Sequence, residues 1–135
     1  MIKEIVNFKQ ANIYQKDKLI LSNIDLKISK GEFVYLIGKT GSGKSSLLKT
    51  MYADIPLKSG KGEMVGYELA SIKASQVAEL RKKLGIVFQD FNLLMDRSIQ
   101  QNMTFVLKAT GWEDTTKMKK RISLVLDLVG LDGTI

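Results

Sequence analysis

The feature that most constrains the fold of this chain is a complete phosphate-binding motif, G-x-x-x-x-G-K-[ST]. Its residues are Gly38, Lys39, Thr40, Gly41, Ser42, Gly43, Lys44 and Ser45. The apolar, β-rich run at 33–37 predicts a buried strand before the motif. The residues from Ser46 to Tyr52 predict a helix after it, with its apolar side against a sheet. Strand, loop and helix together predict an α/β fold with a phosphate site at the start of a helix.

The residue types of the motif explain its chemistry. Glycines at 38, 41 and 43 allow backbone angles that point successive N–H groups inward at phosphate oxygens. Lys44 is predicted to reach the β- and γ-phosphates, and the Ser45 hydroxyl to ligate Mg²⁺. The sequence therefore predicts a site for a magnesium-bound nucleoside triphosphate. The same motif can bind ATP, GTP or another triphosphate, so it indicates a protein superfamily but not a specific function.

Composition narrows the class of protein. At 135 residues with 44% hydrophobic side chains, the chain is large enough for one domain with a core, and it has no cysteine for a disulfide or thiolate metal site. It shows no signal-peptide pattern and no apolar run long enough for a membrane span, so we expect a soluble chain. The net charge of +7 fits nucleic acid, an anionic membrane surface or bound phosphate, or simply a basic solvated surface. The basic clusters at 81–83 and 117–121 lack interleaved aromatic residues, and we expect no nucleic-acid partner.

The first third of the chain predicts an antiparallel sheet. Residues 24–28 alternate between apolar and polar side chains, which is the period of a half-buried strand, and a short strand is expected near 63–65. A second apolar run at 84–88 predicts another core strand that ends at Gln89 and Asp90. Ligands of parallel α/β sheets bind beyond the carboxyl ends of such strands, so this polar pair is a candidate site.

From residue 98 onward the pattern becomes helical. Ser98 and Gln101 have the S-x-x-Q spacing of a capping box, and the helix that follows is expected to end at Gly111. A second helix is expected beyond Trp112, with Gly130 as its C-cap.

The second helix has an amphipathic stripe that indicates which face is buried. The stripe consists of Met118, Ile122, Val125, Leu126 and Val129. Asp127 follows an apolar run, as a magnesium-binding Asp at the end of a strand would. Because its flanks have the helical period, we interpret Asp127 as a surface residue of the helix.

The order of these features resembles the ATP-binding subunits of ABC transporters. The phosphate loop is followed by residues 80–90, LRKKLGIVFQD, which look like the segment that leads into the Q-loop of that family. Residues 87–98, VFQDFNLLMDRS, are most similar to the FtsE-type, cell-division branch. The resemblance covers nearly the whole chain. It implies a P-loop NTPase core of the ABC type at 1–90, with an N-terminal antiparallel β subdomain, and the start of a helical subdomain at 91–135.

The resemblance also implies roles for single residues, with ATP and Mg²⁺ as cofactors. Tyr14 matches the aromatic residue that stacks on adenine, although a lone Tyr also fits an ordinary edge strand. Gln89 matches the Q-loop glutamine, whose oxygen contacts Mg²⁺ and the attacking water, and Lys44 is the other catalytic residue. The nucleotide contacts run from Gly38 to Ser46.

This chain departs from the usual family residues at three positions, Lys39, Thr40 and Ser46. They are wildcard or hydroxyl-preserving positions, so nucleotide binding is expected to survive. Lys39 either adds positive potential near the phosphates or points to solvent, and we favour solvent.

The partners implied by the resemblance belong to a membrane complex. They are an integral membrane protein of the FtsX-like permease type, contacted by the segment from Phe91 to Arg97, and a second copy of the full-length ATPase. The implied location is the cytoplasmic face of the bacterial plasma membrane. The apolar residues of that segment fit contact with such a partner and core packing equally well.

The family continues with a Leu-Ser-Gly-Gly-Gln signature, a strand ending in Asp-Glu and a switch histidine, and this sequence reaches Ile135 without them and has no histidine. Because electrostatic preorganisation is incomplete without them, we expect this polypeptide alone to hydrolyse ATP negligibly. Two alternatives stay open. One is the ATP-binding subunit of a lipoprotein-release or amino-acid transporter, and the other is a nucleotide-binding module that does not hydrolyse.

Overall fold

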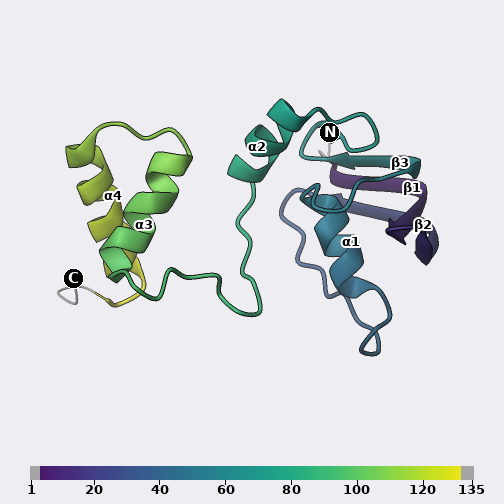
Figure 1. Ribbon diagram of the computed structural model, residues 1–135, viewed down its shortest axis with the longest axis horizontal. Helices are drawn as coiled ribbons and strands as arrows, with labels where there is room; N and C mark the ends of the chain where they lie inside the picture. The colour runs from purple at the N-terminus through teal and green to yellow at the C-terminus, as the bar shows by residue number, and fades with distance from the viewer. Residues whose placement is uncertain (1–3, 132–135) are drawn as a thin grey trace. The chain divides into compact units, whose positions relative to one another are not determined.

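The computed structural model describes residues 4–131 and divides the chain into two compact units, residues 1–85 and 86–135. Within the described residues, the first unit contains a four-stranded sheet and two helices, and the second contains a pair of helices (Figure 1). No helix within 4–131 combines the length and the apolar character needed to cross a membrane.

The sheet of the first unit consists of antiparallel strands in the order β2-β1-β3-β4. They are β1 (Glu4–Gln15), β2 (Lys18–Ser29), β3 (Ser59–Met64) and β4 (Tyr67–Glu68). The alternating residues 24–28 lie in β2, and the short strand expected near 63–65 is the end of β3. The predicted N-terminal antiparallel sheet is therefore confirmed.

Strand β1 supplies much of the core because it lies between β2 and β3. Its buried residues are Val6, Phe8, Ala11 and Ile13, so the buried positions change from even to odd along the strand. Gln10, with a φ of 47°, lies at a register shift between β1 and β2. Its amide donates to Asp25 Oδ1 at 2.9 Å. This bulge inserts one residue and returns the next apolar side chains to the core face.

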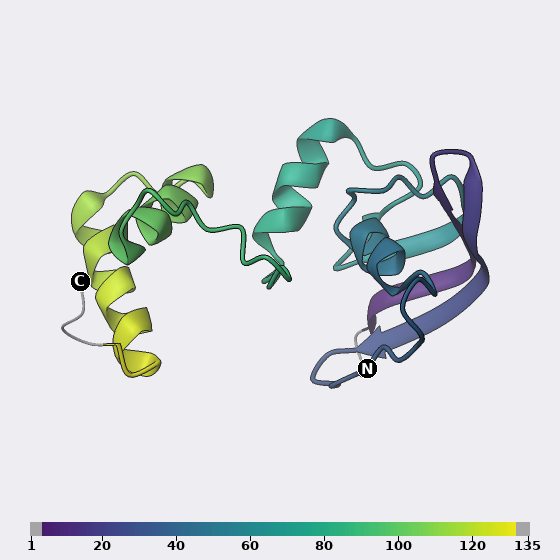
Figure 2. The ribbon, with the colours of Figure 1, turned by 60° about the horizontal axis from the view of Figure 1, so that its bottom comes forward.

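Helices α1 (Lys44–Met51) and α2 (Ala74–Lys82) complete the first unit (Figure 2). Leu47 and Thr50 are the buried residues of α1, which contacts β1. Leu80 of α2 belongs to the same buried cluster as Phe8. The helix predicted at 46–52 is therefore present with an earlier start, whereas α2 was not expected from the sequence patterns.

One side chain of α2 ties it to the end of α1. The Arg81 Nε donates to the Tyr52 carbonyl at 3.0 Å, and its Nη2 donates to the Ala53 carbonyl at 3.3 Å. The guanidinium also lies over the Tyr52 ring, 5.9 Å from its centre. Carbonyl groups at a helix C-terminus have no partner within the helix, so a cation with several N–H donors stabilises this end.

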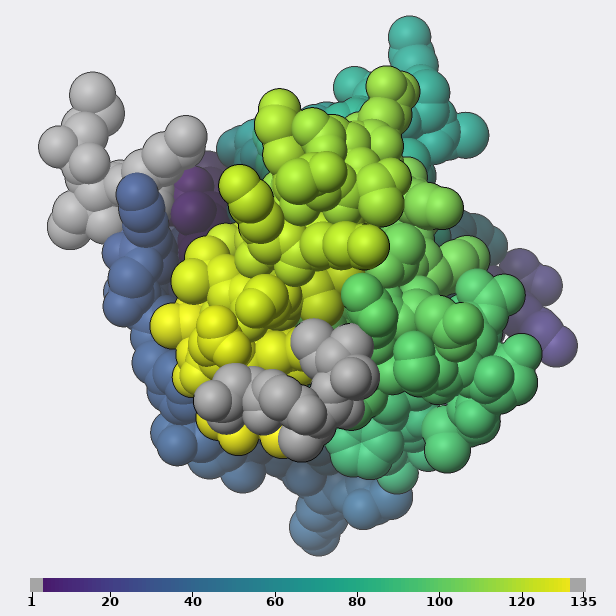
Figure 3. Space-filling model, turned by 90° about the vertical axis from the view of Figure 1, so that its left-hand side faces the viewer, coloured from purple at the N-terminus to yellow at the C-terminus, as the bar shows by residue number. Residues whose placement is uncertain are grey.

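The second unit is built on α3 (Ile99–Ala109) and α4 (Thr115–Leu128), which lie against each other (Figure 3). The predicted capping box is present: Gln101 N donates to Ser98 Oγ at 3.2 Å, and Ser98 N donates to Gln101 Oε1 at 3.0 Å. Helix α3 ends before Gly111, which has a φ of 95°. The first predicted helix is thus confirmed at both ends.

Helix α4 buries part of its predicted stripe. Met118, Ile122 and Leu126 are buried, whereas Val129 lies just past the helix and is 64% exposed. Asp127 is an exposed helical residue, as interpreted from the sequence. Gly130 has a φ of 73° and follows the helix, as expected for a C-cap.

The two predicted core strands at 33–37 and 84–88 are wrong for the described residues. Neither segment is a strand, and Phe33, Ile37 and Val87 are 82%, 89% and 89% exposed. A strand forms only where a neighbour accepts and donates its ladder hydrogen bonds. The strands β1 to β4 pair with one another, and no residue within 4–131 pairs with these two segments. Apolar composition predicted buried strands, but it does not supply the neighbouring strands on which both pairing and burial depend.

Candidate nucleotide-binding site

The phosphate motif forms an exposed loop that leads directly into α1. Gly41 and Gly43 have φ values of 80° and 96°, in the region that side chains disfavour, and Gly43 is the N-cap of α1. Ser42 N donates to the Lys39 carbonyl at 3.1 Å, which closes the turn. The loop therefore has the curved backbone that the motif predicts.

Other atoms come close to two of the loop glycines. A Cβ at Gly38 would lie 2.6 Å from Ser42 Oγ, which is the end of a side chain that can rotate away. A Cβ at Gly43 would lie 2.9 Å from side-chain atoms of both Ile20 and Leu21 in β2. The sheet thus supports the loop at the point where the helix begins.

Lys44 folds back across the loop. Its Nζ donates to the Gly38 carbonyl at 2.6 Å and to the Lys39 carbonyl at 2.8 Å. The ammonium group is therefore held beside the glycine-rich backbone, where a phosphate oxygen is predicted to bind. An ammonium group also forms charge-assisted hydrogen bonds with phosphate oxygens.

The start of α1 is electrostatically suited to an anion. Its first turn has no acidic residue, and the first N–H groups of a helix have no partner within it. Ser45 is exposed and Ser46 is half-buried. Buried Thr50 donates its hydroxyl to the Ser46 carbonyl at 2.9 Å, which anchors this turn to the core. A serine hydroxyl is an oxygen donor of the kind that Mg²⁺ prefers, so these residues fit a magnesium-bound triphosphate.

The remaining loop residues, Lys39 and Thr40, are exposed at the tip. Among residues 4–131, no hydrogen bond or ion pair of the Lys39 side chain fixes its direction, and its solvent orientation stays a prediction.

Tyr14 lies in the hairpin that supports the loop. It pairs with Leu19, and the next two residues of β2, Ile20 and Leu21, are those that approach Gly43. The structure therefore brings the hairpin end and the phosphate loop together within one unit. Stacking of the half-buried Tyr14 on adenine stays a prediction.

Gln89 is exposed in a turn that follows residues 84–88. It belongs to the second unit, whereas the phosphate loop belongs to the first. Its approach to Mg²⁺ and water therefore stays a prediction.

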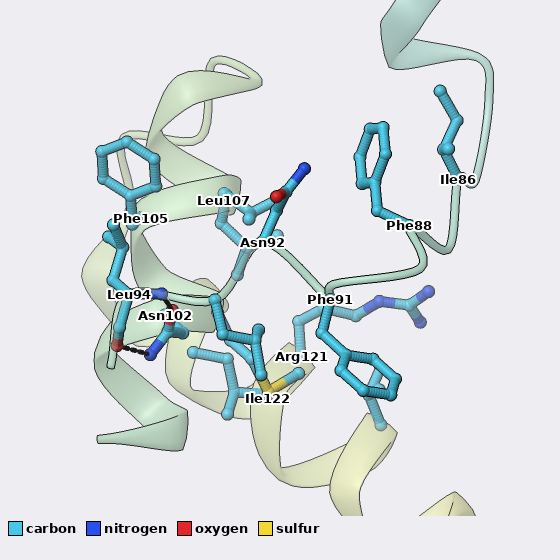
Figure 4. A pocket seen from close by; sticks show the side chains of 14 residues that line it. Ile86, Phe88, Phe91, Asn92, Leu94, Asn102, Phe105, Leu107, Arg121 and Ile122 are labelled. Carbon is cyan, nitrogen blue, oxygen red and sulfur yellow. Dashed lines mark hydrogen bonds between the residues drawn. The ribbon is translucent and has the colours of Figure 1, made fainter. Parts of the chain in front are cut away.

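The second unit has an apolar pocket of about 460 Å³, which is lined in part by residues on either side of Gln89 (Figure 4). Phe88, Phe91 and Leu94 line it from the segment that precedes α3, and Phe105 and Ile122 line it from the helices. Sequence patterns did not single out Asn102, which lies in α3 and binds the loop backbone next to this pocket. The capping box three residues earlier marked only the start of its helix.

Comparison with known proteins identifies the family. Residues 21–134 match the ABC transporter family. The chain is 33% identical over 118 residues to the cell division ATP-binding protein FtsE of Streptococcus pneumoniae and 40% identical over 111 residues to that of Bacillus subtilis. These alignments cover 87% and 82% of this chain but 51% and 48% of the relatives, so the chain spans about half of their length.

A second group of relatives serves a different process. The methionine import ATP-binding protein MetN of Helicobacter pylori is 33% identical over 135 residues, which is 100% of this chain and 40% of that protein. Among solved structures, the dimeric post-hydrolysis structure of the ATP-binding cassette MJ0796, bound to ADP and Pi, matches with a TM-score of 0.80 and 26% identity. That match covers 96% of this chain and 59% of the other.

The family match extends over most of the chain. The predicted likeness to ABC ATP-binding subunits, FtsE among them, is confirmed. This chain belongs to the ABC transporter family and has the α/β fold of its ATP-binding cassette.

Proposed function

We propose that this chain binds ATP with Mg²⁺ and serves as the ATP-binding subunit of an ABC-type membrane complex. The observation that carries the proposal is the loop of the first unit, in which Lys44 lies across a glycine-rich backbone at the start of an acid-free helix. Such a loop binds phosphate through backbone N–H groups, the helix dipole and one lysine.

The residues of the site have separate tasks in this proposal. Lys44 neutralises charge on the β- and γ-phosphates, and the Ser45 hydroxyl completes the ligands of Mg²⁺. Tyr14 stacks on the adenine, which distinguishes a base from a bare triphosphate. Gln89 is proposed to bring a neutral oxygen to Mg²⁺ and the attacking water.

The membrane partner is proposed to dock on the loop of residues 91–97. Phe91, Leu93 and Met95 are 70%, 59% and 90% exposed there, a concentration of apolar surface that indicates a contact with another protein. The whole ATPase is proposed to act as a dimer on the cytoplasmic face of the membrane, as the dimeric MJ0796 structure suggests for the pairing.

We favour a cell-division role with an FtsX-like partner. The sequence of residues 87–98 and the relatives named FtsE support it. The alternative is an importer subunit of the methionine type, which the MetN relatives support over the same part of the chain. Co-purification with an FtsX-like membrane protein, and not with a methionine-import permease, would decide for cell division.

Calorimetric titration with ATP in the presence of Mg²⁺ tests the nucleotide site. Lys44→Ala is expected to weaken binding by about tenfold or more, because charge-assisted hydrogen bonds to phosphate are lost. Lys49→Ala is the matched control, since it removes another lysine of α1 that pairs with Asp54 at 3.8 Å. Equal affinities of both variants, or no binding by the unaltered chain, would contradict the proposal.

A further inference from the structure

Leu21 of β2 lies next to an irregular position of its strand. It pairs with Ile13 of β1, and the next pair along the ladder is Tyr14 with Leu19, so β2 carries one extra residue, Ile20, at this point. Residues two apart in a regular strand share a face of the sheet, and an extra residue between them breaks this rule. Leu21 accordingly shares a face with the buried Ile13, whereas Leu19 is 46% exposed. The bulge at Ile20 therefore decides which face Leu21 occupies.

A second bulge, on the other side of Leu21, is held by hydrogen bonds. Between the two ladder pairs that flank Asn23, β2 has one residue more than β1. Asn23 has a φ of 53°, a left-handed conformation that asparagine adopts more readily than most residues. Its N–H donates to Asn12 Oδ1 at 2.7 Å, and Asn12 Nδ2 donates to Ser59 Oγ of β3 at 3.1 Å. These bonds tie the bulge across β1 to β3, so Leu21 has a fixed position on the sheet.

From this position Leu21 reaches Gly43, the N-cap of α1. A Cβ added at Gly43 would lie 2.9 Å from both Cγ and Cδ2 of Leu21, so the leucine side chain lies directly against the glycine backbone. The Gly43 carbonyl accepts a hydrogen bond from the Leu47 N–H at 3.0 Å. The contact with Leu21 is therefore made at the residue where the loop becomes a helix.

The phosphate loop has little other support before this contact. Every residue from 31 to 42 is exposed, and the segment 33–37 forms no strand within residues 4–131. Burial begins at the half-buried Gly43 and reaches the core at Leu47. The contact between β2 and Gly43 is thus the first anchor that the chain meets after the loop.

We propose that Leu21 is a positioning residue of the nucleotide site: it packs against Gly43 and so holds the loop and the start of α1 in the arrangement that receives the phosphates. This inference rests on the proposed function, because the loop that is held is the proposed ATP site. A preformed site binds more tightly than one that its ligand must order, so Leu21 raises the affinity for ATP through Gly43.

Leu21→Ala is the informative variant because it removes the Cγ and Cδ2 atoms that lie against Gly43. Leu26→Ala is the matched control. It makes the same change at another half-buried position of β2, where Leu26 pairs with Phe8 and packs against the core cluster. Leu21→Met tests for rescue, since leucine and methionine exchange with little change in packed volume. Should Leu21→Ala not fold, Leu21→Val takes its place, because it shortens the side chain with a residue that suits a strand.

Three quantities are measured for each variant: the affinity for ATP with Mg²⁺ by calorimetric titration, hydrogen exchange at the Leu47 amide, and the melting temperature. We expect Leu21→Ala to bind ATP about five- to tenfold more weakly, because only the fraction of molecules with the loop in place is competent to bind. Exchange at Leu47 should be faster, since its N–H donates to the Gly43 carbonyl. Leu21→Met should restore both quantities. Leu26→Ala should leave the ATP affinity unchanged even where its melting temperature falls as far.

Each other outcome has a clear meaning. Unchanged ATP affinity in Leu21→Ala, or an equal loss in Leu26→Ala, would overturn the positioning role while the proposed function stands. Binding by Leu21→Met as weak as that of Leu21→Ala would also overturn it, because packing against Gly43 would then not be what matters. Failure of the unaltered chain to bind ATP would refute the proposed nucleotide site, and with it the role of Leu21.

Discussion

Single residues set the geometry of the phosphate loop, and Gly43 does so in two ways. Its φ of 96° is unfavourable for a side chain, and an added Cβ would lie 2.9 Å from Ile20 and Leu21. Gly41 has a similar φ of 80° but no atom within 4 Å of its Cβ position. Gly43→Ala is therefore expected to lower the free energy of unfolding by about 1–2 kcal/mol more than Gly41→Ala, the scale of overpacking.

Urea unfolding of both variants measures this difference, and the pair controls for backbone strain because both glycines have positive φ. Equal free energies of unfolding for Gly43→Ala and Gly41→Ala would show that the β2 side chains move aside without cost and do not support the loop. The motif predicts from the sequence that glycine is needed at both positions. Only the structure shows that Gly43 also lies against β2, whereas Gly41 does not.

At the scale of elements, Arg81 connects the helix of the phosphate loop to α2. Its hydrogen bonds to the Tyr52 and Ala53 carbonyls stabilise the end of α1. Arg81→Ala is expected to lower the free energy of unfolding by about 1 kcal/mol, because the side chain is exposed and one charged donor group is lost.

Lys82→Ala is the control for loss of charge next to Arg81. Lys82 pairs with Glu79 at 3.0 Å on the surface of α2, and such a pair contributes only about 0–1 kcal/mol. Thermal unfolding measures the stability of both variants. A larger loss of stability in Lys82→Ala than in Arg81→Ala would contradict the proposed connection between the two helices. Nothing in the sequence pattern indicated Arg81 for this task, since its acceptors lie 29 and 28 residues away.

At the scale of the whole molecule, local patterns predicted what local interactions decide. The loop glycines and the capping box of Ser98 and Gln101 were predictable, because each involves residues close in the sequence. The segment 33–37 was not, because a strand depends on distant neighbours for its hydrogen bonds. Asn102 was missed for a related reason, since its purpose appears only when its helix meets the loop.

The last prediction concerns turnover by the chain as a whole. The described site holds a phosphate loop, but the 135 residues contain no histidine and no Leu-Ser-Gly-Gly-Gln signature. Binding without those groups leaves the transition state poorly stabilised, so we expect ATP binding with negligible multiple-turnover hydrolysis. Phosphate release from the purified 135-residue chain measures this, with Lys44→Ala as the background control. Sustained release that Lys44→Ala abolishes would contradict the prediction and would mean that these residues alone assemble a working catalytic site.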